Sequence, residues 1–107
     1  MAMQSISNEK QFQSEVLDSE VPVVVDFYGE WCSPCKAIMP MFEELSLEKN
    51  FKVVKVDVDE PNLVSVIQRH RIMAVPAIFI YNNGEIIDRI IGNTVDRVSI
   101  LNKIPIQ

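Results

Sequence analysis

Hydrophobic positions repeat along the chain with two periods, and together they predict five strands and four helices. Residues 23–28 form a nearly continuous apolar run that Pro22 opens. A run of this length is typical of a strand buried on both faces, as in a sheet covered by helices. The other strands are predicted over residues 1–6, 52–58, 77–81 and 85–91.

Apolar residues three or four positions apart predict helices over residues 8–18, 34–50 and 59–70, and a closing helix from residue 95. Pro40 lies inside the second helix and is expected to kink it, because proline lacks an N–H and clashes with the preceding turn. Asp59 is expected to cap the third helix, with Pro61 in its first turn.

The order of the elements predicts the fold class. Helices between the early strands require parallel crossovers, whereas the turn Asn82-Asn83-Gly84 requires an antiparallel hairpin. We therefore predict an α/β fold with a central mixed sheet, in which parallel strands are joined by an antiparallel C-terminal hairpin, and with helices on both faces. No linker or repeat interrupts the sequence, so residues 1–107 are expected to form one domain.

Composition excludes several classes of protein. Apolar residues make up 48% of the chain and charged residues 23%, which is typical of a globular protein and not of a disordered one. The net charge of −5 argues against nucleic acid or an anionic membrane as partner, because both require clustered Lys and Arg. No signal peptide and no membrane-spanning run is visible, so we expect a cytoplasmic location.

The candidate chemistry lies in Trp31-Cys32-Ser33-Pro34-Cys35-Lys36, which holds both cysteines between a buried strand and a helix. Cysteines three residues apart on a first helical turn have Cα atoms within the roughly 4.4–6.8 Å that a disulfide allows. Cys32, at the helix start, faces free N–H groups and the positive end of the helix dipole, which stabilise a thiolate. Cys35 is better shielded and suits a resolving role, and Pro34 fits the first turn.

The cysteine pair has other interpretations. A structural zinc site requires about four ligands, and His70 is the only histidine, so no metal site is expected. A static disulfide across one turn closes too small a loop to add much stability. Two merely buried cysteines would leave Trp31 and Pro34 unexplained. A disulfide that opens and closes is the favoured interpretation.

Further motifs accompany this segment along nearly the whole chain. They are Val25-Asp26-Phe27, Pro40, Lys55-Val56-Asp57-Val58-Asp59, Ile72-x-x-Val75-Pro76, Asn83-Gly84 and Gly92. In this order and spacing, with the cysteine segment, they resemble the thioredoxin family. The resemblance implies a thioredoxin fold and a protein-disulfide reductase in which Cys32 is the nucleophile and Cys35 the resolving cysteine.

Asp26 interrupts the apolar strand 23–28. Burial would raise its pKa towards the range useful for proton transfer, whereas an Asp at a strand end can also be simply solvated. The resemblance implies a buried aspartate that takes the proton from the resolving cysteine. It also makes Lys55 the lysine near that aspartate; a solvated strand lysine is the alternative.

Pro76 stands before an apolar strand, where a proline removes a ladder N–H. The resemblance implies a cis peptide bond between Val75 and Pro76, with the proline packed against the disulfide. It further implies an apolar substrate groove with Met73 beside it. The expected groove residues are Trp31, Ala74, Val75, Pro76, Ile91 and Gly92. From the residues alone, a core aromatic is the less favoured alternative for Trp31, ordinary strand packing fits Ile91 equally well, and Gly92 fits a close backbone approach.

Some residues depart from the family pattern. Ser33 stands where most thioredoxins have Gly, Ala74 where Gly is usual, and Ala77 where Thr is usual. Tyr28-Gly29 replaces the common aromatic-Ala pair. The Ser33 hydroxyl can hydrogen-bond to a thiolate. These changes bear on partner specificity more than on the chemistry.

The resemblance also implies partners. No nucleotide-binding glycine loop is present, so no bound cofactor is expected, and electrons are expected from a separate NADPH-dependent flavoprotein, a thioredoxin reductase. Disulfide-containing proteins are the expected substrates, and the protein itself is expected to be a monomer. A disulfide oxidase or isomerase, and a thioredoxin-fold binding module with idle cysteines, are the alternative functions.

Overall fold

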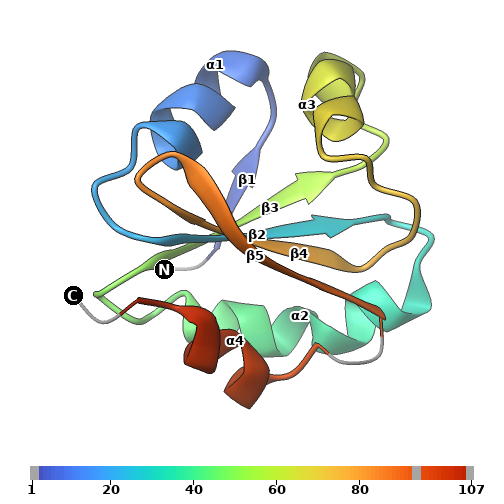
Figure 1. Ribbon diagram of the computed structural model, residues 1–107. Coiled ribbons are helices and arrows are strands. Elements are labelled where there is room, and N and C mark those ends of the chain that lie inside the picture. Colours follow the sequence, from blue (N-terminus) through green and yellow to red (C-terminus); the bar gives the residue numbers. More distant parts are fainter. Residues whose placement is uncertain (1–2, 93–94, 106–107) are drawn as a thin grey trace.

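The computed structural model describes residues 3–92 and 95–105 and has a five-stranded sheet between two layers of helices (Figure 1). Its strands are β1 (Gln4–Ile6), β2 (Val23–Tyr28), β3 (Lys52–Asp57), β4 (Ala77–Asn82) and β5 (Glu85–Ile91). They lie in the order β1-β3-β2-β4-β5. The pairs β1·β3 and β2·β3 are parallel, and the pairs β2·β4 and β4·β5 are antiparallel. The predicted mixed sheet is confirmed.

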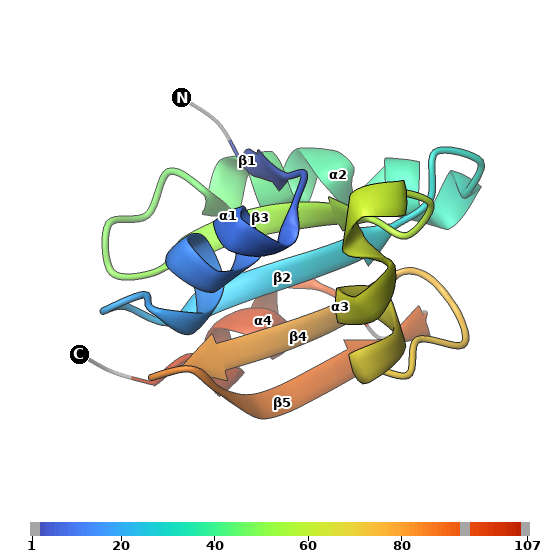
Figure 2. The same cartoon turned by 90° about the horizontal axis from the view of Figure 1, so that it is seen from above.

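Helices cover both faces of this sheet, as predicted (Figures 1 and 2). One face carries α1 (Glu9–Phe12), the π-helix η1 (Gln13–Leu17), the 3-10 helix η2 (Pro61–Leu63) and α3 (Val64–Arg69). The other face carries α2 (Ser33–Leu45) and α4 (Arg97–Lys103). None of the helices in the described ranges is long and apolar enough to cross a membrane.

Each layer of helices closes its own hydrophobic core, because successive side chains of a strand point to opposite faces of the sheet. Val25 and Phe27 of β2 belong to the core under α1 and α3, which includes Phe12. Val24 belongs to the core under α2 and α4, which includes Phe42. Asp26 alternates with Val25 and Phe27 and therefore lies on the α2 face of the sheet.

The type of the first helix and the end of the second differ from the prediction, because packing against the sheet determines both. The predicted helix 8–18 begins as α1, capped by the Asn8 side chain, and widens into η1 after Phe12. Helix α2 ends at Leu45 instead of residue 50. Leu47 beyond it is 65% exposed, so the next turn would have no apolar side chain on the core and no packing to stabilise it. Pro40 does lie inside α2.

The prediction that Asp59 caps the third helix is wrong. The side chain of Glu60 instead accepts the hydrogen bond from the Asn62 backbone N–H at the start of η2. Both acidic residues precede Pro61, and either could have supplied the cap, because each offers a carboxylate near the first free N–H groups. Asp59 has a different partner, in the candidate site described below.

Two glycines have the left-handed backbone that favours this residue type. Gly84 has φ +79° in the β4–β5 turn, and a Cβ there would lie 2.9 Å from the carbonyl oxygen of Leu17. Gly92 has φ +80°, but a Cβ there would meet no atom within 4 Å. The close backbone approach expected at Gly92 is therefore wrong, and its backbone conformation accounts for the glycine instead.

Candidate active site

The two cysteines lie at the N-terminal end of α2, in the turn that follows strand β2. They are joined by a disulfide, and their Cα atoms are 5.3 Å apart. Cys32 is the N-cap residue of α2, and its Sγ accepts a hydrogen bond of 3.2 Å from the backbone N–H of Cys35. Cys35 is fully buried, whereas Cys32 retains 4% exposure. The helix start therefore offers a hydrogen-bond donor to the sulfur that is the less shielded of the two.

Ser33 and Pro34 lie between the cysteines and face solvent. Pro34 occupies the first turn of α2, where its missing N–H leaves no helical hydrogen bond unmade. With the disulfide formed, the Ser33 hydroxyl has no hydrogen bond to either sulfur. Any bond from this hydroxyl to a thiolate would have to form after reduction.

Pro76 lies beside the disulfide, on the segment that leads into β4. The Val75–Pro76 peptide bond is cis, as the family resemblance implied, and Pro76 is buried. The carbonyl oxygen of Val75 lies 3.8 Å from Cys32 Sγ. Gly92 donates its backbone N–H to the carbonyl oxygen of Pro76 over 3.2 Å. The first contact places the backbone of residues 75–76 next to Cys32, and the second places Gly92 next to Pro76.

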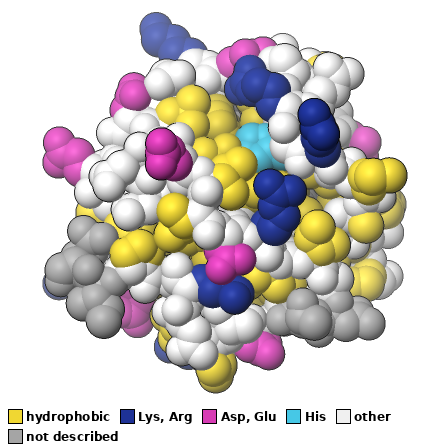
Figure 3. Space-filling view, viewed as in Figure 1, with side chains coloured by type: hydrophobic (Ala, Val, Ile, Leu, Met, Phe, Trp, Pro, Cys, Tyr) yellow, Lys and Arg dark blue, Asp and Glu magenta, His cyan; other side chains and the backbone are white. Residues whose placement is uncertain are grey.

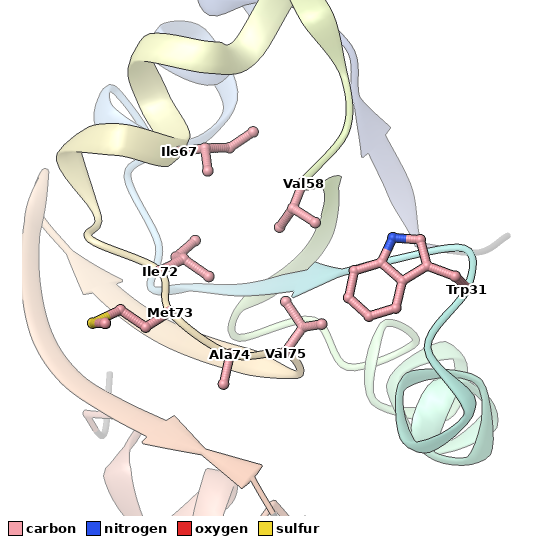
Figure 4. Close-up of a pocket in the computed structure, with 7 residues that line it drawn as sticks. All are labelled: Trp31, Val58, Ile67, Ile72, Met73, Ala74 and Val75. Carbon is pink, nitrogen blue, oxygen red and sulfur yellow. The ribbon is translucent and has the colours of Figure 1, made fainter.

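A pocket of about 270 Å³ opens beside Trp31 (Figure 4). Three of the expected groove residues line it, namely Trp31, Ala74 and Val75, together with Met73. Pro76, Ile91 and Gly92 do not line this pocket. Ile91 is 50% exposed at the edge of the sheet, opposite Ala77 in the strand register, so it lies at the surface and not in a packed core.

Three residues that line the pocket were not among the expected groove residues, namely Val58, Ile67 and Ile72. Val58 and Ile67 follow the strand and helix periods and so were indistinguishable from core residues in the sequence, and Ile72 was noted only as part of the motif that ends at Pro76. Figure 4 shows that they come from three different parts of the chain and point towards one space. Only the packing of α3 against the end of β3 brings them together.

Trp31 lies on the surface with 66% exposure, so the alternative of a core aromatic is wrong. Its indole Nε1 donates a hydrogen bond of 2.8 Å to Asp59 Oδ2. The ring also lies against Gly29, where a Cβ would be only 2.6 Å from Trp31 Cε2. Asp59 and Gly29 thus hold the indole at the mouth of the pocket.

Asp26 is completely buried, which decides against a solvated aspartate at a strand end. Among the described residues, neither of its carboxylate oxygens has a hydrogen-bond partner. Burial raises its pKa to about 7, and the positive charge of Lys55 opposes part of this increase. Lys55 is the register partner of Asp26 on β3 and is half-buried, with its Nζ 5.7 Å from the centre of the Tyr28 ring.

In the part of the chain that the structure describes, no group of three or more His, Cys, Asp and Glu side chains is arranged to hold a metal ion. The single histidine, His70, is buried at the end of α3. Its Nε2 lies 2.6 Å from the Tyr81 hydroxyl, and its Nδ1 lies 2.7 Å from the carbonyl oxygen of Val66. Both ring nitrogens are therefore occupied within the protein.

A disulfide whose outer sulfur receives a hydrogen bond from a helix N-terminus is typical of the dithiol–disulfide oxidoreductases, because that position stabilises the thiolate that reduction would release. The comparisons with known proteins agree with this class. The family model described as Thioredoxin matches residues 3–104, and the chain therefore belongs to the thioredoxin family.

Relatives and solved structures support the same assignment. The chain is 42% identical over 93 residues to a thioredoxin of Rickettsia bellii, covering 84% of this chain and 86% of that protein. It is 36% identical over 90 residues to a mitochondrial thioredoxin of Mus musculus, covering 82% of this chain and 53% of that protein. A solved thioredoxin structure from Malassezia sympodialis superposes with a TM-score of 0.80 at 35% identity, covering 94% of this chain and 86% of that one. The protein is a dithiol–disulfide oxidoreductase of this family.

Proposed function

We propose that the protein reduces disulfides of other proteins, with Cys32 as the attacking and Cys35 as the resolving cysteine. The observation that carries this proposal is the position of Cys32: its sulfur accepts a hydrogen bond at the start of α2, and the residue keeps 4% exposure while Cys35 is fully buried. A thiolate at Cys32 would gain from the positive end of the helix dipole, and the more accessible sulfur is the one that a substrate can reach.

The reaction transfers two electrons from the Cys32–Cys35 dithiol to a substrate disulfide. The Cys32 thiolate attacks one sulfur of the substrate disulfide, a mixed disulfide forms, and the first substrate thiolate leaves. Cys35, once deprotonated, attacks Cys32 Sγ and releases the second substrate thiolate. The substrate ends as a dithiol, and the protein ends with the disulfide seen in this structure.

Asp26 is proposed to take the proton from Cys35. The supporting observations are its complete burial on the α2 face of the sheet and its pKa of about 7, near which a carboxyl group can both accept and return a proton. Lys55, its register partner, is proposed to tune this pKa, because its positive charge favours the ionised carboxylate.

The substrate is proposed to lie along the apolar surface beside Cys32. Trp31, Ala74 and Val75 would contact it from the pocket, and Pro76, Ile91 and Gly92 would extend the surface towards the edge of the sheet. The Val75 carbonyl oxygen, 3.8 Å from Cys32 Sγ, is placed to accept a backbone hydrogen bond from a bound segment.

Two cysteine variants test the assigned roles. Cys35→Ser should hold insulin as a stable mixed disulfide, because the attack on Cys32 is lost, whereas Cys32→Ser should form none. Non-reducing gels and intact mass measurement would detect the adduct, and both variants should lose insulin reduction with dithiothreitol. An adduct on Cys32→Ser but not on Cys35→Ser would reverse the roles, and full reduction by Cys32→Ser would contradict the proposal.

The electron donor is proposed to be a separate thioredoxin reductase, with no cofactor bound to this chain and with the protein acting as a monomer in the cytoplasm. The bacterial thioredoxin of Rickettsia bellii supports this location, although a mitochondrial relative is also similar. Insulin reduction with NADPH and a thioredoxin reductase tests the donor, run beside a ferredoxin-dependent reductase. Turnover only with the second enzyme would replace the flavoprotein donor and leave the thiol chemistry in place.

Equilibration with a glutathione buffer separates a reductase from a disulfide oxidase or isomerase, which uses the same geometry at a more oxidising potential. A protein that stays mostly a dithiol in a buffer poised for the endoplasmic reticulum would be an oxidase. The reductase proposed here should be mostly oxidised by it.

A further inference from the structure

Three arginines lie close together on the face of the molecule that α1 and α3 cover. Arg69 ends α3, Arg71 follows two residues later, and Arg89 lies on β5; all three side chains are exposed. The charges of Arg69 and Arg89 both act on the buried His70 between them and help to lower its pKa. Figure 3 shows Lys and Arg side chains gathered around this histidine, the only one in the chain. We call Arg69, Arg71 and Arg89 the arginine patch.

Among the residues that the structure describes, no acidic side chain forms an ion pair with the patch. Ion pairs within the described ranges join Lys52 to Glu15, Arg97 to Glu44 and Lys103 to Asp88, and none of them includes a residue of the patch. Arg89 packs its guanidinium 5.1 Å above the centre of the Phe79 ring, which fixes the cation without neutralising it. The chain has 15 acidic and 10 basic residues, so most basic side chains would be expected to find an acidic partner. Three exposed arginines without one among the described residues are therefore unusual for this surface.

The arginine patch adjoins the pocket of the candidate active site through Arg71, which directly precedes the lining residue Ile72. Arg69 lies two residues after Ile67, which also lines the pocket. In Figure 4 these two isoleucines lie at the end of the pocket away from Trp31. The Trp31 end is acidic, because Asp59 accepts the indole hydrogen bond there. The residues that line the pocket are apolar; Arg71 adjoins Ile72 at the end near α3, and Asp59 is bound to the indole at the Trp31 end.

We propose that the arginine patch recognises an acidic segment of the disulfide-containing substrate protein. This segment flanks the reacting cysteine of the substrate and lies over Ile67 and Ile72. The inference rests on the function proposed above and specifies its substrate class. The apolar pocket supplies contact area. The charges near its two ends determine the direction in which the segment binds, because acidic residues of the substrate would be repelled by Asp59.

Two synthetic disulfide peptides test this preference. They share the apolar residues beside the cystine and differ only in carrying Asp or Asn in the flanking segment. Protein reduced with dithiothreitol and desalted is mixed with each peptide, quenched with acid, and the reduced peptide is quantified by chromatography. We expect the Asp peptide to react about threefold to tenfold faster in 10 mM salt, with the ratio approaching one in 1 M salt, because the Debye length falls from about 30 Å to about 3 Å.

Single charge removals locate the effect. Arg71→Gln and Arg69→Gln should each lower the Asp/Asn rate ratio, whereas Lys49→Gln should leave it as in the wild type. Lys49 makes a matched control, since it is exposed and follows the end of α2 opposite to the cysteines. Equal rates for both peptides would overturn the proposal, as would an equal loss of preference in Lys49→Gln. A wild type that reduces neither peptide would instead contradict the proposed reductase function.

Discussion

At the scale of single residues, the position of Trp31 depends on the absence of a Cβ atom at Gly29. Gly29 has no Cβ, and a Cβ built there would lie 2.6 Å from the indole ring, well inside van der Waals contact. The ring can therefore lie flat on the backbone and reach Asp59 Oδ2 over 2.8 Å. The departure from the aromatic-Ala pair at Tyr28-Gly29, visible in the sequence, thus has a structural consequence beside the cysteines.

Gly29→Ala should displace the indole and break its hydrogen bond to Asp59. The cost in folding free energy should stay below about 1 kcal/mol, because an exposed side chain can rotate away from the added methyl group. The single tryptophan makes the measurement direct: hydrogen exchange of the indole N–H, followed by NMR, should become faster. Asp59→Asn serves as the reference, and unchanged exchange in Gly29→Ala would show that the ring tolerates the methyl group in place.

The sequence allowed the reacting residues of this site to be predicted but not the residues that support them. Cys32 and Cys35 were predicted because motif and spacing are local properties of the chain, whereas the cis bond before Pro76 was implied by the family resemblance. The contact of Asp59 with Trp31 was not predicted, because an aspartate before a helix is also a good cap. The two residues are 28 positions apart, and only the packed structure decides between the two roles.

At the scale of elements, the turn of the β4–β5 hairpin lies close to the backbone at the end of η1. The turn between the strands contains Asn83 at φ +55° and Gly84 at φ +79°. A Cβ on Gly84 would also approach the Leu17 carbonyl oxygen to 2.9 Å, and a backbone atom cannot rotate away as a side chain can. The Asn-Asn-Gly motif predicted the turn, whereas its contact with the first helix depends on how the layers pack.

Gly84→Ala should therefore destabilise the protein by about 2 kcal/mol, since a left-handed backbone and a close contact with backbone are both imposed on the new methyl group. Urea unfolding followed by circular dichroism would measure the loss. Asn83→Gly is the matched control at the neighbouring position and should change the stability by less than about 0.5 kcal/mol, because glycine adopts the same φ freely. Equal effects of the two substitutions would refute the role assigned to the Leu17 contact.

Element types followed from periodicity, but their ends did not. Five strands and the helix positions were predicted because alternation and helical spacing are strong in this β-branched sequence. The π-helix after Phe12 was not predicted, since the apolar period continues through Val16 and Leu17. The end of α2 at Leu45 was also not predicted, although no residue after Leu45 continues the apolar spacing. In each case, contact with the sheet determines where the regular helix stops being favourable.

At the scale of the whole molecule, the described residues include two buried polar or charged side chains, Asp26 and His70, one on each face of the sheet. Asp26 lies on the α2 face of the sheet without a hydrogen-bond partner among the described residues. His70 lies on the other face among the rings of Phe12, Phe27 and Phe79. Burial raises the pKa of Asp26 to about 7 and lowers the pKa of His70 below 6.5. The two groups therefore make stability depend on pH in opposite directions.

The sign for each group follows from proton binding in the folded and unfolded chains. Unfolded Asp26 loses its proton near pH 4 and folded Asp26 near pH 7, so the folded state binds more protons between these values and stability falls as the pH rises. Unfolded His70 gains a proton near pH 6.5, and the folded protein resists it, so stability falls as the pH drops below about 6.5. The wild-type profile is the sum of both slopes.

Replacing Asp26 or His70 alone should leave the pH dependence of the unfolding free energy that comes from the other residue. In Asp26→Asn, stability should rise with pH from 4 to 7, and the gain over wild type at pH 8 should exceed the gain at pH 4 by at most about 4 kcal/mol, the equivalent of about three pKa units. In His70→Gln, stability should fall over the same range. Urea unfolding at half-unit pH steps would give both profiles, and the double variant should lose both slopes whatever its absolute stability. Parallel profiles for wild type and Asp26→Asn would show that Asp26 keeps an ordinary pKa, and the proton-acceptor role proposed for it would then lose its physical basis.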